Sequence, residues 1–170
     1  MPNILVALLV LAQAGSTSIP AADVTAADIQ TTLENAIPVA PGIIDTPIRT
    51  LDAGGHDVGV AIVDRIRAVN VVAGTIHTGV TEVYTVLKGS GTLVTGGRLI
   101  DPQPRGGILA TARRNGTSGP GFRGAGMEGA VTRRVAAGDI VIVPAGTPHY
   151  FSEISESITY TVMRFYPTRD

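Results

Sequence analysis

Two of the three histidines of the chain lie in stretches whose residue types can do metal chemistry. His77 and Glu82 fall within residues 75–91, ahead of an apolar run that ends in a Gly-x-Gly turn, and His149 falls within residues 138–151, after a second apolar run. Two imidazoles and one carboxylate form the ligand set of a divalent ion that keeps open coordination positions. The sequence therefore predicts one site for Fe, Mn, Ni or Zn, shared by two distant stretches.

Strand periodicity indicates which side chains share such a site, because successive side chains of a strand point to opposite faces. Three pairs of residues are expected to face inward together: Thr75 with His77, Glu82 with Tyr84, and His149 with Phe151. Tyr84 is therefore the candidate catalytic residue, as an acid or an orienting group, with a purely packed tyrosine as the alternative. An arginine from residues 105–134 is a second candidate for that role.

His56 is a fourth candidate ligand. If the polar segment 64–67 is a turn between strands over 58–63 and 68–73, residue 56 lies roughly across from residues 75 and 76. A shift of one residue in register would turn the side chain to the other face. The alternative is a histidine in a surface loop.

Each ligand also has an interpretation without metal. His77 and His149 can be hydrogen-bonded interior residues of a barrel that binds no ion, and Glu82 can pair with an arginine such as Arg164. A buried carboxylate with neither partner is disfavoured, because its desolvation is costly.

Short β-rich runs separated by Gly, Asn, Asp and Pro occupy the chain from about residue 43 onward. Besides the two runs around 64–67, strands are expected over 82–87, 92–94, 140–143 and 158–163, with a turn at 88–91. Many short strands with glycine turns are typical of a sandwich or barrel. Because no helix alternates with these strands, a parallel α/β sheet is excluded.

The N-terminal third has a different pattern. Residues 4–12 are an apolar run too short to span a bilayer, which takes about 20 residues, and a small-x-small site follows it. Residues 1–20 are therefore predicted to be a signal peptide, which implies a periplasmic or secreted protein, and the alternative is a buried N-terminal segment of a cytoplasmic protein. Within the arm over 21–56, a capping box at Thr25 and Asp28 predicts a helix over about 26–36 on the outside of the barrel or against a neighbouring subunit.

Composition sets further limits. The chain has 170 residues, 44% of them hydrophobic and 16% charged, which is enough for one globular domain. A net charge of −1 favours neither nucleic acid nor an acidic membrane surface as a partner. With no cysteine, disulfides, thiolate metal sites and cysteine nucleophiles are excluded.

The residues of the two stretches resemble the two motifs of small single-domain cupins. The second motif, Gly-x5-Pro-x-Gly-x2-His, is matched in full by Gly138, Pro144, Gly146 and His149. The first is matched in part by Gly74, His77, Glu82 and Gly89. It departs from the pattern at Thr75, which stands where the family has its first histidine.

The resemblance covers about residues 57–165 and implies an all-β fold, a cupin-type double-stranded β-helix or jelly-roll barrel with a short N-terminal helix. The barrel would occupy residues 57–170 and carry a Gly- and Arg-rich loop at about 96–137. It also implies a metal-dependent enzyme acting on a small oxygenated organic molecule, of the dioxygenase, isomerase or lyase type. The alternatives are a non-catalytic protein that binds a small molecule or sugar, and a homodimer in which residues 21–50 supply an exchanged strand.

Overall fold

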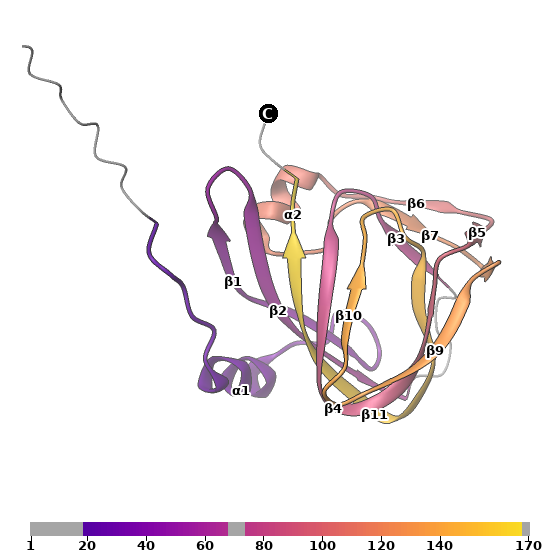
Figure 1. Cartoon of the computed structure of the whole chain (residues 1–170), viewed down its shortest axis with the longest axis horizontal. Helices are drawn as coiled ribbons and strands as arrows, with labels where there is room; N and C mark the ends of the chain where they lie inside the picture. The colour runs from indigo at the N-terminus through magenta and orange to yellow at the C-terminus, as the bar shows by residue number, and fades with distance from the viewer. Residues whose placement is uncertain (1–18, 68–73, 168–170) are drawn as a thin grey trace, which may run out of the picture.

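The computed structural model describes residues 19–67 and 74–167 (Figure 1). Helix α1 (Ala26–Asn35) starts at the predicted capping box: Thr25 Oγ1 accepts from the Asp28 N–H at 3.1 Å, and the Asp28 carboxylate accepts from the Thr25 N–H at 2.8 Å. No residue of α1 is buried, and Figure 1 shows the helix outside the barrel. The helix prediction is confirmed.

The signal peptide predicted over residues 1–20 lies outside the described residues except for its last two positions, and it stays a prediction. Across the rest of the chain, neither described helix has the length and hydrophobicity that crossing a membrane requires.

The described residues form eleven strands and a second helix, and every strand pairing is antiparallel. The two longest strands, β4 (Thr81–Thr95) and β11 (His149–Phe165), pair with each other along most of their length. The remaining elements are β1 (Ile43–Asp52), β2 (Asp57–Ile66), β3 (Thr75–His77), β5 (Arg98–Ile100), β6 (Gln103–Arg105), α2 (Leu109–Asn115), β7 (Gly121–Arg123), β8 (Gly126–Glu128), β9 (Val131–Ala136) and β10 (Ile140–Val143).

These strands curl into a barrel. On one side of the long pair β11 is bonded to β2 and β3, and on the other side β4 is bonded to β9 and β10. In the larger sheet the order runs β1-β2-β11-β3-β7-β6, while β4 pairs with β9, β10 and β11; β5 and β8 form a separate two-stranded sheet. The prediction of an all-β jelly-roll barrel with a short N-terminal helix is confirmed.

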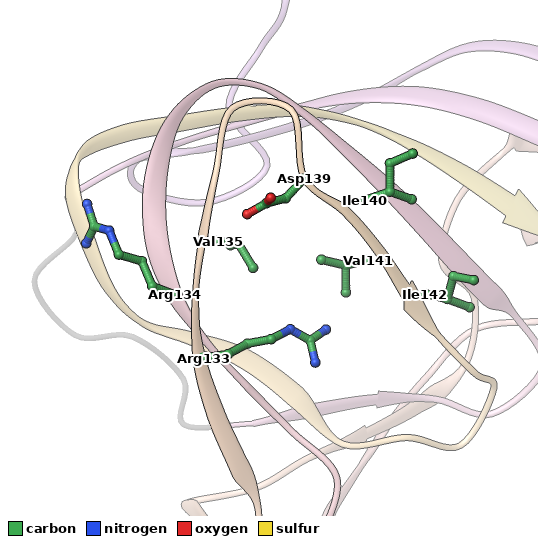
Figure 2. Close-up of a pocket in the computed structure, with 7 residues that line it drawn as sticks. All are labelled: Arg133, Arg134, Val135, Asp139, Ile140, Val141 and Ile142. Atoms are coloured by element: carbon green, nitrogen blue, oxygen red, sulfur yellow. The ribbon is translucent and has the colours of Figure 1, made fainter.

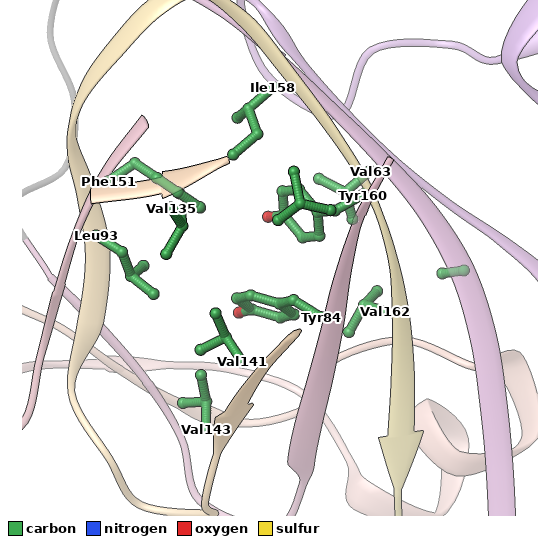
Figure 3. Close-up of a cluster of buried hydrophobic side chains, with 12 residues drawn as sticks. Val63, Tyr84, Leu93, Val135, Val141, Val143, Phe151, Ile158, Tyr160 and Val162 are labelled. Atoms are coloured by element: carbon green, nitrogen blue, oxygen red, sulfur yellow. The ribbon is translucent and has the colours of Figure 1, made fainter. Parts of the chain in front are cut away.

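Apolar side chains from the inner faces of these strands fill the barrel (Figure 3). Tyr160 lies at the centre, with its ring 4.7 Å from that of Tyr84 and 5.9 Å from that of Phe151 between centroids. Leu93 and Ile158 are fully buried beside them. Side chains of β4 alternate between buried and partly exposed over its first six residues, as the period of two predicts. Glu82, Tyr84 and Val86 therefore face the interior of the barrel.

Two predicted turns are wrong, because one segment lies wholly and the other mostly within a longer strand. The segment 64–67 does not close a hairpin, since β2 continues through Ile66 and pairs with both β1 and β11; the strand predicted over 68–73 lies outside the described residues. The segment 88–91 bends β4 without ending it. Gly89 has a φ of 76°, and a Cβ there would collide with the carbonyl oxygen of Ser157, so glycine is required for a bend as it would be for a turn.

The span 96–137 is not one loop, because it contains four short strands, α2 and the whole of β9. Strand β7 lies directly against β3, with Gly121 opposite His77. A Cβ at Gly121 would collide with the carbonyl oxygen of Ile76, so this close approach of the two backbones depends on glycine. Strands of three residues are too short to show periodicity, which explains why the sequence favoured a loop.

Candidate metal centre

The two motif stretches meet at one end of the barrel. His149, the first residue of β11, pairs with Thr75 of β3, and the N–H of Gly146 donates to the carbonyl oxygen of His77 at 2.9 Å. Glu82 lies near the start of β4, opposite Val143 of β10. Backbone pairing therefore places the ends of three ligand-bearing strands side by side.

The structure brings His77, Glu82 and His149 together, and one possible ligand atom from each lies within 4.8 Å of the others. The Oε2 atom of Glu82 is 3.9 Å from Nε2 of His77 and 3.7 Å from Nε2 of His149. The three residues are 9%, 2% and 7% exposed, in chain order. A shared, nearly buried group of two imidazoles and one carboxylate is a ligand set for a divalent ion.

Glu82 also forms the predicted alternative contact, an ion pair with Arg164. Nε of Arg164 donates to Oε1 of Glu82 at 3.0 Å, its Nη2 donates to both carboxylate oxygens of Asp45, and its Nη1 donates to the carbonyl of Gly116. The two interpretations are compatible, because Arg164 takes Oε1 and leaves Oε2 facing the imidazoles. Asp45 was missed by sequence reasoning, since nothing in the residues around it marks a partner 119 positions away.

Electrostatics keep Glu82 ionised. Burial alone would raise the pKa of its carboxyl, but the guanidinium of Arg164, aided by the imidazoles wherever they are protonated, outweighs burial and lowers the pKa to about 2. A charged carboxylate is the form that binds a metal.

His149 has the hydrogen bond that a metal ligand needs. Its Nδ1 lies 2.9 Å from the carbonyl oxygen of Thr147, which can only accept, so Nδ1 carries the proton and the Nε2 lone pair faces Glu82. Burial lowers the pKa of His149, so the ring is neutral.

The ring of His77 has the opposite tautomer to that of His149. Nη1 of Arg105 lies 3.0 Å from its Nδ1, and because a guanidinium only donates, Nδ1 must accept. The proton of the neutral ring is then on Nε2, the atom that faces Glu82. Burial is the largest of the effects that lower the pKa of His77 to about 3; the charge of Arg105, and a proton on His149 when it is present, act in the same direction against the opposing effect of Glu82.

Tyr84 is both packed and polar. Its hydroxyl donates to Oε2 of Glu82 at 2.7 Å, while its ring packs on Tyr160 in the core. Burial, reinforced by the Glu82 charge, raises the pKa of Tyr84 well above its usual value, so the hydroxyl keeps its proton. Tyr84 is thus a fixed hydrogen-bond donor beside the ligand set.

His56 does not join the other three residues. It lies in the turn between β1 and β2, where its carbonyl oxygen accepts from the N–H of Ala53 at 2.8 Å. The prediction that it approaches residue 75 depended on the hairpin at 64–67, which is not formed. In the structure the neighbours of Thr75 across the ladder are Arg123 and His149.

Both Nε2 atoms of the site reach solvent. Neither atom forms a hydrogen bond with the described residues. Every fully buried side-chain nitrogen or oxygen of those residues does form one, so these two atoms are not fully buried. A pocket of ≈ 530 Å³ lies elsewhere: Figure 2 shows it against β9 and β10, with Arg133 and Ile142 at its wall. A smaller pocket of ≈ 180 Å³ is lined by Arg105 and adjoins the site.

The three residues fit a divalent metal in type and spacing. Two ligands about 2.1 Å from a tetrahedral ion are about 3.4 Å apart, and the two measured separations, 3.7 and 3.9 Å, are close to that value. The single feature that opposes binding is the Arg105 hydrogen bond, which keeps the Nδ1 lone pair of His77 occupied.

The position of the second motif within this barrel decides the fold type. Gly138 lies in the turn between β9 and β10, Pro144 and Gly146 lie in the turn after β10, and His149 is the first residue of β11. The turn after β10 lies beside the end of β3 that carries His77 and the start of β4 that carries Glu82. The chain has a cupin fold.

No family model and no curated protein matches the chain. Among solved structures, KdgF from Halomonas sp. is similar over 80% of this chain and 90% of its own, with 18% identity and a TM-score of 0.48. BH2720 from Bacillus halodurans is similar over 89% and 86%, with 16% identity and a TM-score of 0.48. The Schizosaccharomyces pombe Cnp3 cupin domain is similar over 74% and 61%, with 8% identity and a TM-score of 0.46. A cupin fold hosts many activities, so function has to be argued from the site.

Proposed function

We propose that this cupin is a metal-dependent enzyme that acts on a small oxygenated organic molecule at the mouth of the barrel. The observation that carries the proposal is the convergence of His77, Glu82 and His149, with ligand atoms within 4.8 Å of one another and neither Nε2 atom fully buried. Three protein ligands leave coordination positions for a substrate. The candidate ions are Fe, Mn, Ni and Zn.

Residues around such a centre would have separate roles in orienting its ligands and the substrate. When bound, the metal supplies Lewis-acid polarisation of a substrate oxygen. Arg164 fixes the carboxylate of Glu82 from one side, and Thr147 fixes the ring of His149 from another. Tyr84 would act as the orienting donor, because its protonated hydroxyl already lies at Oε2 of Glu82. The reaction would be of the dioxygenase, isomerase or lyase type.

Elemental analysis of the purified protein after metal supplementation tests the first step. We expect close to one equivalent of a divalent metal in the wild type, a strong loss in His149→Ala, and no loss in His56→Ala. The His56 variant is a matched control, because it removes an imidazole from the turn between β1 and β2. Less than about 0.1 equivalent in the wild type would contradict the proposal, since a preformed three-ligand site retains its metal.

Catalysis is tested separately, by turnover of a panel of small oxygenated substrates. We expect His149→Ala to abolish any activity that the wild type shows, and His56→Ala to retain it. Unchanged turnover in His149→Ala would exclude the metal-dependent reaction.

A second function, non-catalytic binding of a small molecule or sugar, is favoured by a specific observation. Thr75 stands where the family has its first histidine, which leaves the site one ligand short of the family's set. In this case a ligand would bind equally well with and without a chelator, and no substrate of the panel would turn over.

We further propose that the protein is exported and forms homodimers. Support for export comes from the apolar run at residues 4–12, and support for dimers from the resemblance to cupins. Detection of a shortened chain in the periplasm or medium tests the first proposal, and light scattering tests the second, because a monomer would contradict it.

A further inference from the structure

Arg105 of β6 is a half-buried cation whose position the metal-site proposal does not explain. Its Nη1 donates to three acceptors: Nδ1 of His77 at 3.0 Å, Oγ of Ser118 at 3.0 Å and the carbonyl oxygen of Gly119 at 3.1 Å. Among the described residues no carboxylate forms an ion pair with it. Half-buried charges are normally paired, so this guanidinium has capacity for an anion.

The free edge of Arg105 has the geometry for a carboxylate. Nε and Nη2 lie on one edge of the guanidinium, and neither makes a hydrogen bond within the described part of the chain. Because no buried polar side-chain atom there lacks a partner, both nitrogens reach solvent. Two parallel N–H donors on one edge match the two oxygens of a carboxylate.

A pocket of ≈ 180 Å³ adjoins Arg105 and is suited to a small molecule. Its wall combines Arg105 with two hydroxyls, Thr111 and Thr117, and with the exposed apolar side chain of Ile108. No acidic side chain lines it. An anionic head with a short apolar or hydroxylated body fits this lining.

Arg105 also decides what His77 can do. While Nη1 donates to Nδ1 of His77, the ring proton lies on Nε2, and that nitrogen cannot offer a lone pair to a metal. A metal bound through Nε2 needs the opposite tautomer, in which Nδ1 carries the proton and repels the donor of Arg105. The arginine and the metal therefore compete for His77.

We propose that Arg105 binds the carboxylate of a small ligand and, in moving onto it, releases His77 to complete the metal centre. A carboxylate on the Nε and Nη2 edge is a stronger partner for the guanidinium than a neutral imidazole nitrogen is for Nη1, so a bound ligand draws the guanidinium toward the pocket and away from His77. The inference rests on the proposed metal site and adds to it a ligand class, small carboxylates, and a coupling between ligand and metal.

Zinc affinity, measured by competition with a chromophoric chelator, tests the coupling without any assay of activity. The full chain is compared with Arg105→Met and with Arg123→Met, a control that removes the same charge from the neighbouring strand β7, where Arg123 is exposed and opposite Gln103. Each protein is titrated alone, with propionate, and with propionamide, which has the same shape as propionate but no charge.

We expect propionate to tighten zinc binding roughly tenfold in the wild type and in Arg123→Met, within the usual range of coupling between two ligands, and propionamide to leave it unchanged. In Arg105→Met the propionate effect disappears, and zinc binds roughly tenfold tighter than to Arg123→Met even without ligand, because nothing competes for His77. A propionate effect that persists in Arg105→Met, or equal zinc affinities of the two ligand-free variants, overturns the inference and leaves the proposed function intact. No zinc binding by any of the three proteins overturns both.

The tautomer of His77 gives a second measurement that needs no metal. Nitrogen-15 NMR of the metal-free wild type and of Arg123→Met should show the proton of His77 on Nε2 and that of His149 on Nδ1, and Arg105→Met should shift His77 away from this state. A proton on Nδ1 of His77 in the metal-free wild type would overturn the inference.

Discussion

His149 and His77 approach the same carboxylate oxygen at nearly the same distance, 3.7 and 3.9 Å, but their second ring nitrogens have opposite partners. A backbone carbonyl accepts from Nδ1 of His149, two residues away in the chain, whereas a guanidinium donates to Nδ1 of His77 from 28 residues away. His149 is thus prepared for a metal by its own turn. His77 depends on Arg105, which lies outside both motifs. The two halves of the site are therefore unequal, because only the His77 half must lose a hydrogen bond before a metal can bind.

Removal of Arg164 should have the largest effect, because Glu82 is common to both halves. Arg164→Met leaves two carboxylates, those of Glu82 and Asp45, near each other without their cation. We expect a loss of about 3–5 kcal/mol in the free energy of unfolding, the usual result of removing one partner of a buried ion pair. Urea denaturation measures this loss, with the exposed Arg123→Met as the control. A loss below about 1 kcal/mol would contradict a stabilising role for the ion pairs of Arg164 with Glu82 and Asp45.

Deletion of each histidine in turn tests the inequality directly. We expect His149→Ala to weaken zinc binding by about 100-fold or more and His77→Ala by only about 10-fold, because binding through His77 first requires release from Arg105. Chelator competition measures both affinities under the same conditions. Equal losses, or a larger loss in His77→Ala, would show that the two halves are equivalent.

Acid should destabilise the metal-free protein through His77. Its pKa is about 3 in the folded protein, against an ordinary value of 6.5, so the unfolded chain takes up the proton first. The stability that neutral His77 provides is complete above pH 6.5 and is lost as the pH falls toward 3, by up to about 1.4 kcal/mol per pH unit. Urea denaturation between about pH 7 and pH 4 should show this slope, and His77→Gln should flatten it.

Tyr84→Phe should have a smaller effect on stability than Arg164→Met. It removes one hydrogen bond to the ionised Glu82 and keeps the ring that packs on Tyr160. We expect a loss of about 1.5–3 kcal/mol in the free energy of unfolding, as for hydrogen bonds to charged groups. Added to His77→Ala or to His149→Ala, Tyr84→Phe should change the zinc affinity by the same factor. An effect confined to one of these backgrounds would assign Tyr84 to one half of the site.

Prediction from the sequence succeeded where the signal is local. The alternation of Glu82 and Tyr84 along a strand, and the short spacing within each motif, were sufficient to predict the barrel and to select the three residues that converge. Glycine was ambiguous, because the same conformational freedom serves a turn and a bend, so β4 was predicted as two strands. The error at 64–67 then placed His56 near the site.

Side-chain contacts between residues far apart in the sequence left no such signal. Arg105 lies in a strand of three residues, and Asp45 lies in a segment that was expected to be an outlying arm. Their contacts with His77 and Arg164 follow from how β1, β6 and β11 come together, which no residue spacing encodes. Sequence reasoning anticipated an orienting arginine somewhere within residues 105–134 but could not select it.

The ion pair between Arg164 and Asp45 has a consequence for assembly. Asp45 belongs to β1, an edge strand that pairs only with β2 among the described strands, while Arg164 also holds Glu82. If β1 were displaced, for example by strand exchange with a second copy, Arg164 would lose one of its two counter-charges and draw more strongly on Glu82. Association at the edge of the barrel would then be sensed at the ligand set as a change in its affinity for metal.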